Sequence, residues 1–173
     1  MNDLIHIRYG RRGDIHRVAV FLHNCWQAAY RPIVAEHDLN AISVEQRHHG
    51  LLTRYDTGSS EFLMMFDESR LIGTAVFGKS STEGYADDGE ITAIYLHRDS
   101  FGKGYGRRLF IQAELALAAK GYAHFVLDVL AGNAQALRFY LARGYEKVTD
   151  RSVRLGENDY PLAVLRKKNS LRV

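Results

Sequence analysis

The sequence predicts a mixed α/β domain built on a central sheet, and three observations support this fold class. Short segments typical of strands are interspersed with stretches whose apolar residues recur at helical spacing. Their order along the chain is β-α-α-β-β-β-α-β-α-β-β, as in domains that pack helices on a sheet. The chain has 173 residues, of which 46% are hydrophobic, enough for one substantial core. We therefore expect a single domain over residues 1–173.

The first quarter of the chain predicts one strand and two helices. Residues 5–9 alternate apolar and polar side chains as a strand does. Asp14 is a candidate N-cap for a helix that runs to about Tyr30, and Pro32 ends or kinks this helix. Residues 43–46 match a capping box and predict the start of a second helix. The apolar stripe of the first helix consists of Ile15, Val18, Ala19, Leu22, Trp26 and Ala29.

The middle of the chain predicts three strands. Residues 61–66 and 71–77 flank a short polar segment and are typical of a hairpin. Residues 83–89 are acidic and contain glycine, which favours a loop. A further strand follows over residues 90–97.

The last third of the chain predicts a helix, a strand, a second helix and an antiparallel strand pair. The first helix is rich in Ala and Leu on several sides, which indicates that it is well buried. These elements cover residues 105–120, 124–130, 133–144, 145–155 and 160–166.

Composition excludes several classes of function. The net charge of +3 is mild and no dense run of Lys and Arg is present, so we expect no nucleic-acid partner. No apolar run is long enough to span a bilayer, and the alternating N-terminus is not a signal peptide. The lone Cys25 fits a reducing, cytoplasmic location. We expect the basic residues 166–168 to form a solvated end.

A glycine-rich loop precedes the predicted helix at residue 105. Glycines stand at positions 102, 104 and 106, with Lys103 and Arg107 among them. Glycines let a ligand approach the backbone closely, and a helix start presents free amides at the positive end of the helix dipole. This combination predicts a phosphate cradle. The spacing does not fit a dinucleotide-binding loop or a Walker loop.

The loop resembles the acetyl-CoA loop of the GNAT superfamily of N-acetyltransferases. The family pattern is Gln/Arg-x-x-Gly-x-Gly/Ala, and Gly104 and Gly106 match it, whereas Phe101 stands where Gln or Arg is usual. Downstream, residues 133–140 read Asn-Ala-Gln-Ala-Leu-Arg-Phe-Tyr and are followed by Gly-Tyr at 144–145. This segment resembles the second hallmark of the family. The resemblance covers essentially the whole chain.

The resemblance implies that acetyl-CoA is the cofactor and an amine is the acceptor. Backbone amides of the loop would hold the pyrophosphate, and the pantetheine arm would pair with the end of the preceding strand. Asn133 has two roles that we weigh equally, a polar contact to the cofactor arm and a helix cap. The implied cofactor-binding residues are Ile94, Tyr95, Leu96, Gly102, Lys103, Gly104, Tyr105, Gly106, Arg107 and Asn133.

The resemblance also implies two catalytic roles. Tyr140 is the candidate general acid, because a phenol stays protonated at neutral pH and can donate to a leaving thiolate. Glu90 is the candidate base, since it opens the strand that leads to the glycine loop. Asp87, Asp88 and Asp128 are weaker alternatives for the base. Water and proximity alone would be a further alternative.

The sequence gives less information on the acceptor pocket than on the cofactor site. Trp26, Tyr30 and Tyr160 are candidates to line it, although Trp26 also fits a core position. The leading hypothesis is a small-molecule primary amine. A protein or peptide acceptor, or an acyl-CoA sensor without turnover, remains open. We expect no metal site, and dimers common in the resembling family make a homodimer an expectation.

Overall fold

The computed structural model describes residues 4–171, so the ends of the expected domain, 1–3 and 172–173, lie outside the described residues. Five α-helices and two short 3₁₀ turns occur within this range, and the turns are η1 (Arg12–Asp14) and η2 (Arg98–Ser100). The helices are α1 (Ile15–Tyr30), α2 (Glu36–Leu39), α3 (Val44–Asp56), α4 (Tyr105–Ala119) and α5 (Ala134–Leu141). The strands are β1 (Ile5–Tyr9), β2 (Ser60–Asp67), β3 (Arg70–Lys79), β4 (Gly89–Leu96), β5 (His124–Leu130), β6 (Glu146–Leu155) and β7 (Asn158–Lys168).

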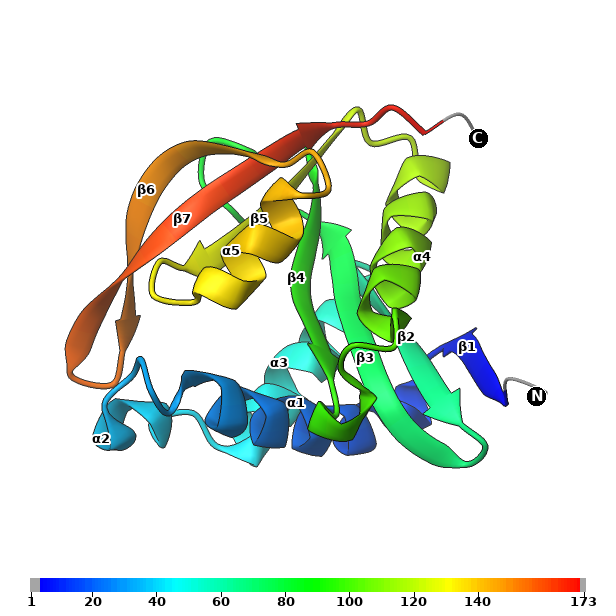
Figure 1. Ribbon diagram of the computed structural model, residues 1–173, viewed down its shortest axis with the longest axis horizontal. Helices are drawn as coiled ribbons and strands as arrows, with labels where there is room; N and C mark the ends of the chain where they lie inside the picture. The colour runs from blue at the N-terminus through cyan, green and yellow to red at the C-terminus, as the bar shows by residue number, and fades with distance from the viewer. Residues whose placement is uncertain (1–3, 172–173) are drawn as a thin grey trace.

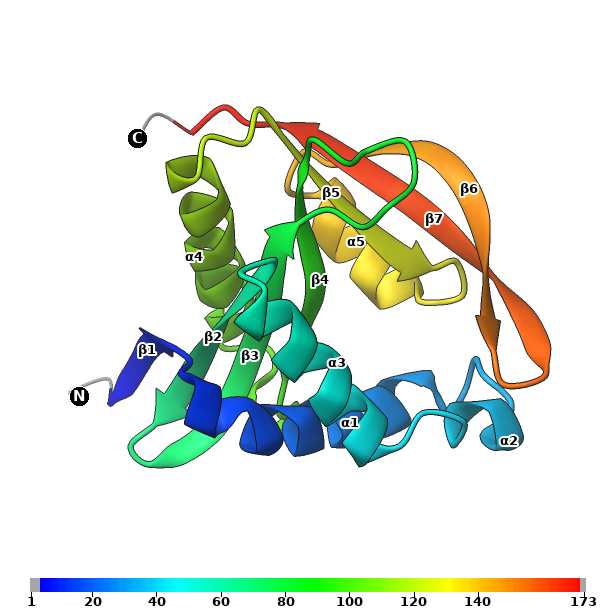
Figure 2. The ribbon, with the colours of Figure 1, turned by 180° about the vertical axis from the view of Figure 1, so that it is seen from behind.

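The expected mixed fold and element order are confirmed, with the short helix α2 as an addition. The strands form one sheet in the order β1-β2-β3-β4-β5-β7-β6. Only β4 and β5 pair in parallel, whereas every other neighbouring pair in the described sheet is antiparallel. Figure 1 shows α4 and α5 on one side of the sheet, and Figure 2 shows α1 and α3 on the other side. The molecule therefore has three layers.

Two apolar clusters separate the faces of the sheet. One packs α4 against strand residues such as Phe77, Ile91 and Phe125. The other packs α1 against strand residues such as Phe62 and Met64. Side chains that alternate along β2 and β3 serve both clusters, because successive residues of a strand point to opposite faces.

The residues at the start of α1 differ from the expectation. Asp14 does not cap α1 with its side chain. Its carboxylate instead accepts hydrogen bonds from the Arg8 guanidinium, at 2.7 and 2.9 Å, and from the Arg11 amide at 2.8 Å. The hydrogen bonds from Arg8 hold the pKa of Asp14 at about 2. The helix ends at Tyr30, before Pro32, as expected.

The basic residues 166–168 are not a solvated end, and this expectation was wrong. They lie on β7, which pairs with β5 on one side and β6 on the other. Arg166 donates two hydrogen bonds to the buried carboxylate of Asp88, at 2.6 and 3.0 Å. Lys167 donates to the buried carboxylate of Glu114 at 2.9 Å. Charged groups are kept in buried positions when they pair with an opposite charge. The Asp88 carboxylate is occupied in this way by Arg166.

A β-bulge in β4 changes the face of the sheet on which the following side chains of the strand lie. Val76 pairs with Ala93 and Phe77 pairs with Ile91, so Thr92 has no partner on β3. An extra residue reverses the alternation beyond it. The bulge therefore places Glu90 and Tyr95 on the same face of the sheet, the one that α1 covers.

The pairing of β4 with β5 is very short. It comprises only Gly89 with Phe125 and Glu90 with Val126. Beyond Glu90, β4 continues to pair with β3 but has no partner on its other side among the described strands. The strand edge at residues 94–96 is thereby left available to an added extended chain.

The Arg166–Asp88 pair should contribute strongly to stability. Replacing Arg166 by Leu leaves the Asp88 carboxylate buried without its cation, and we expect a loss of about 3 kcal/mol in the free energy of unfolding. Urea titration followed by circular dichroism measures this change. Arg154→Leu is the matched control, because it removes an exposed pair with Asp159 and should cost less than about 1 kcal/mol. Equal losses in the two variants would contradict the prediction.

Candidate functional site

The glycine-rich loop ends at the first turn of α4, and each glycine there has a physical reason. Gly102 and Gly104 have φ angles of 74° and 78°, a left-handed conformation that favours glycine. Gly104 is the N-cap of α4, so the loop runs directly into the free amides of the helix start. A Cβ on Gly106 would lie 3.2 Å from Leu96 Cδ1, so this glycine lets α4 approach β4 closely.

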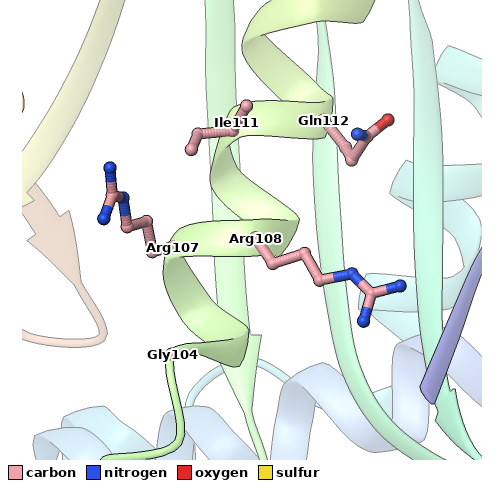
Figure 3. A pocket seen from close by; sticks show the side chains of 5 residues that line it. All are labelled: Gly104, Arg107, Arg108, Ile111 and Gln112. Atoms are coloured by element: carbon pink, nitrogen blue, oxygen red, sulfur yellow. The ribbon is translucent and has the colours of Figure 1, made fainter. Parts of the chain in front are cut away.

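A surface hollow of about 370 Å³ lies beside this helix start. Figure 3 shows Arg107 and Arg108 extending from α4 in different directions at its rim. Arg108 Nη2 donates to the carbonyl of Ile5 at 3.2 Å, so this arginine also ties α4 to β1. The hollow is lined by Gly104, Arg107, Arg108, Ile111 and Gln112.

Arg143 adds a second cation near Arg107, and sequence reasoning did not identify it. Its guanidinium lies 3.4 Å from the centre of the Phe139 ring and donates to the Phe139 carbonyl at 2.6 Å. Burial, and then the neighbouring charge of Arg107, lower the pKa of Arg143. Two like charges beside the positive end of α4 favour an anionic ligand.

Three tyrosines from three different elements form a cluster beside the free edge of β4. We call Tyr30 of α1, Tyr95 of β4 and Tyr140 of α5 the tyrosine cluster. Burial, followed by the neighbouring Tyr30 and Tyr140, raises the pKa of Tyr95, and burial and then Tyr30 raise the pKa of Tyr140, so the three phenol groups lie close together. Asn133 Nδ2 donates to the Tyr30 hydroxyl at 3.4 Å. Predicted site residues far apart in the sequence thus lie together.

Asn133 performs the capping role that the sequence predicts. Its Oδ1 accepts the amide of Ala136 at 3.1 Å, which satisfies a free donor in the first turn of α5. Its Nδ2 is the group that faces Tyr30. One side chain therefore positions both the helix that carries Tyr140 and the hydroxyl of Tyr30.

Tyr140 is protonated at neutral pH. Burial, followed by the nearby Tyr30, raises its pKa well above the usual value for a phenol. Its ring packs against Phe110, Phe139 and Tyr145. The hydroxyl is consequently a donor whose position is fixed by aromatic packing.

Glu90 is buried at the point where β4 and β5 part. Its Oε2 accepts the Ser81 amide at 2.7 Å and the Ser81 hydroxyl at 3.2 Å. Asp128 lies two residues beyond Val126, the strand partner of Glu90, and on the same face of the sheet. Partial burial, and then the charge of Glu90, raise the pKa of Asp128, while Arg151 opposes the rise. The charge of Glu90 therefore reaches Asp128.

Trp26 and Tyr160 lie in the apolar cluster that also contains Tyr30 and Tyr95. The Trp26 and Tyr30 rings have centroids 4.3 Å apart. The Tyr160 hydroxyl donates to Asp38 at 2.6 Å and accepts from the Ala35 amide at 3.0 Å. The Tyr160 ring therefore contributes to this apolar cluster, while its hydroxyl is occupied by Asp38 and Ala35.

Asp38 anchors the β6–β7 hairpin to α2, and sequence reasoning missed it. Besides Tyr160, its carboxylate accepts the Glu157 amide at 2.8 Å and Asn158 Nδ2 at 2.7 Å. Hydrogen bonds from Tyr160 and Asn158 lower the pKa of Asp38 to about 2. Asp38 precedes Leu39 in a short polar helix, and nothing in the local sequence pattern indicates partners 120 positions away.

The remaining cofactor-loop candidates occupy the positions that the sequence indicates. Lys103 is exposed in the loop, as is Phe101, and Tyr105 packs its ring on the core beside α4. Ile94 and Leu96 also pack on this core through their side chains. Their backbone, together with that of Tyr95, forms the free edge of β4.

The match to a protein family decides the identity of this fold. Residues 21–145 match the model of the acetyltransferase (GNAT) family. The chain belongs to this family. The resemblance found in the motifs is thereby confirmed, as is the expectation of an acyltransferase that uses acetyl-CoA as its donor.

Individual relatives share the fold at low sequence identity. The uncharacterized N-acetyltransferase YuaI of Bacillus subtilis (strain 168) is 27% identical over 149 residues, which cover 85% of this chain and 83% of YuaI. The PaiA N-acetyltransferase of Thermoplasma acidophilum in complex with coenzyme A is 23% identical, with a TM-score of 0.74 and coverage of 95% and 99%. YncA of Salmonella typhimurium with its cofactor acetyl-CoA is 18% identical, with a TM-score of 0.72 and coverage of 98% and 96%.

Other kinds of site find no support in the described part of the chain. Across residues 4–171, no cluster of His, Cys, Asp and Glu is suited to holding a metal ion. No helix in the same range combines the length and apolar character needed to cross a bilayer. Burial raises the pKa of Cys25 to about 11, so this residue is a thiol, not a thiolate nucleophile, at neutral pH.

The left-handed backbone at Gly104 provides a test of the loop. Gly104→Ala introduces strain of about 1 kcal/mol in this conformation and turns the helix-start amides away from the ligand. We expect roughly tenfold weaker coenzyme A binding by calorimetry. Gly58→Ala is the control, since Gly58 has a similar φ of 70° and open space around it in the turn after α3. Equal weakening of coenzyme A binding in both variants would contradict a cradle at Gly104.

The Asp38 anchor predicts a pH dependence of stability. The pKa of Asp38 is lower in the folded state than in the unfolded chain, so its contribution is present above about pH 4 and is lost as the pH falls towards about 2. Asp38→Asn should therefore be less stable than wild type at pH 7, and the difference should shrink across this window. Urea unfolding at each pH measures it. A difference that stays constant with pH would contradict the assignment.

Proposed function

We propose that this protein transfers an acetyl group from acetyl-CoA to the primary amine of a small molecule, by direct attack in a ternary complex. The observation that carries the proposal is the position of the tyrosine cluster. It lies beside the free edge of β4, and that edge leads to the glycine-capped start of α4. This arrangement provides an anion site, an extended-chain site and a proton donor in one continuous path.

The donor supplies an acetyl thioester, and the chain's own residues hold and polarise the reacting groups. The amides of residues 102–107 and the cation Arg107 bind the pyrophosphate, as they would any anion at a helix start. The edge of β4 pairs with the pantetheine amides. In the reaction a C–N bond forms and the C–S bond breaks. Tyr140 donates its hydroxyl proton to the departing sulfur.

The proton lost by the amine passes to a carboxylate at the point where β4 and β5 stop pairing. Glu90 is the base that we propose, and Asp128 is its partner. Burial, and then the charge of Glu90, raise the pKa of Asp128. The raised pKa of Asp128 brings it closer to neutral pH, where a base is most effective. Water links the carboxylates to the amine where direct contact is lacking.

Two further parts of the proposal rest on composition. A cytoplasmic location is supported by the single cysteine, which is a free thiol in the structure. A homodimer remains a prediction, to be checked by sedimentation. Acetylation of a protein or peptide and binding without turnover are the competing functions.

Thiol release from acetyl-CoA tests the proposed activity directly. We expect release that depends on an added small primary amine, and acetylated amine as the product by mass spectrometry. Release with peptides alone would favour the protein-acetylating alternative. Binding of acetyl-CoA without release across a broad panel would favour the sensor.

Tyr140→Phe tests the general acid. We expect kcat to fall roughly 10²–10⁴-fold, because a positioned proton donor is lost, while the ring and its packing remain. Coenzyme A affinity, measured by calorimetry, serves as the control and should change little. Full activity in Tyr140→Phe would exclude this role.

Glu90→Gln and Asp128→Asn test the base. The rise of kcat/KM with increasing pH should move in both variants, since Glu90→Gln removes the proposed base and Asp128→Asn removes its neighbouring carboxylate. A profile identical to that of wild type in both would assign the proton to water alone.

A further inference from the structure

The partly buried side chain of Arg47 has no counter-ion among the described residues. Arg47 lies in the first turns of α3, where Val44, Arg47 and Leu51 follow one another at helical spacing on the side that meets α1. Its Nε and Nη2 atoms are shielded from solvent and make no hydrogen bond within residues 4–171. A charged group thus occupies a position where an apolar residue is expected.

Two other covered charges in the described chain, Asp88 and Glu114, have a counter-ion. Asp88 is paired with Arg166, and Glu114 is paired with Lys167. Arg47 is not within ion-pair distance of any carboxylate in the described residues, and its main contact is with the Trp26 ring, whose centre lies 5.1 Å from the guanidinium carbon. Burial lowers the pKa of Arg47, opposed by Tyr95. Covering an unpaired charge is costly.

The location of Arg47 connects it to the proposed site. Its charge lies close enough to Tyr95 to act on that phenol, and Tyr95 lies close to Tyr30 and Tyr140. The Trp26 Nε1 atom, on the ring beneath the guanidinium, is also buried without a partner in the described residues. Two unsatisfied donors therefore lie together on the face of the sheet that carries Glu90 and Tyr95.

We propose that Arg47 binds a carboxylate of the acceptor, so that the acceptor is an amino acid or a similarly compact molecule with both an amine and a carboxylate. This inference rests on the proposed function and names its substrate class. A guanidinium forms a paired, planar hydrogen-bonding fork that matches a carboxylate, and desolvation by Trp26 strengthens the pairing. The indole N–H of Trp26 supplies a further donor to the same anion.

The same arrangement disfavours other acceptors. A simple alkylamine would leave the guanidinium unsatisfied, and a second cation would be repelled by it. With the acceptor carboxylate held by Arg47 on α3, the amine of the same molecule is left free to react. This charge pattern selects the acceptor and sets its orientation.

Matched acceptors test the inference. The panel consists of α-amino acids, each with its carboxamide and its decarboxylated amine, and thiol release gives kcat/KM for each. Wild type should favour the acid over the amide by roughly 10- to 100-fold, the value of a hydrogen bond to a charged group. Arg47→Met should abolish this preference through KM while activity on the amide changes little. Arg47→Lys, which keeps the charge but not the fork, should be intermediate.

Controls separate binding from folding. Arg12→Met removes an arginine that also contacts α3 but is paired with Asp56, and it should retain the preference for acids. The urea midpoint and coenzyme A affinity of Arg47→Met should match those of wild type. Equal losses on acid and amide in Arg47→Met would assign Arg47 a structural role and overturn the inference.

The outcome also distinguishes this inference from the proposed function. Thiol release with neutral amines alone would support the acetyltransferase activity and overturn the carboxylate site. If no acceptor in the panel reacts, the proposed acetylation of small amines is contradicted. Calorimetry, with the acceptors added to the complex of the protein with coenzyme A, then tests the carboxylate site by itself. The inference is supported if wild type binds amino acids but not their amides, and if Arg47→Met no longer binds the amino acids. Absence of that binding would overturn it.

Discussion

The brief pairing of β4 with β5 is the constraint on which the rest of the site depends. Two residue pairs hold the strands together, and beyond Glu90 they part. A sheet edge normally has to be protected, and here it lies inside the domain, between helices α4 and α5. The energetic cost of free backbone groups is offset when an extended ligand takes the place of a strand. In the proposed function, the pantetheine arm of the donor would complete the sheet at this edge.

The bulge at Thr92 works together with this parting of the strands. Without the extra residue, Tyr95 and Glu90 would point to opposite faces. With it, Tyr95 joins Tyr30 and the carboxylates on the face covered by α1. The opposite face receives Ile94 and Leu96, against which α4 packs at Gly106. One irregularity therefore separates the side that holds α4 in place from the side that presents reactive groups.

Buried charges follow two patterns that have different consequences. The pairs Arg166–Asp88 and Lys167–Glu114 are complete, and they join β7 to the start of β4 and to α4. The partly buried Arg47 and Arg143 and the exposed Arg107 have no such carboxylate partner in the described residues. Complete pairs stabilise the framework, whereas uncompensated cations favour anionic ligands.

The sequence by itself determined the order of the elements, the glycine loop, and the capping of α5 by Asn133. These features are local, since periodicity, turns and caps depend on neighbours within a few residues. Only the tertiary structure decided that Asp88 is paired with Arg166, that Asp128 faces Glu90, and that Arg47 is covered without a counter-ion. These pairings depend on contacts between segments far apart in the chain. The local sequence around a charged side chain does not show which distant residue it pairs with. For this reason the glycine loop and the helices beside it were predictable, and the pairing or isolation of these charges became visible only in the folded protein.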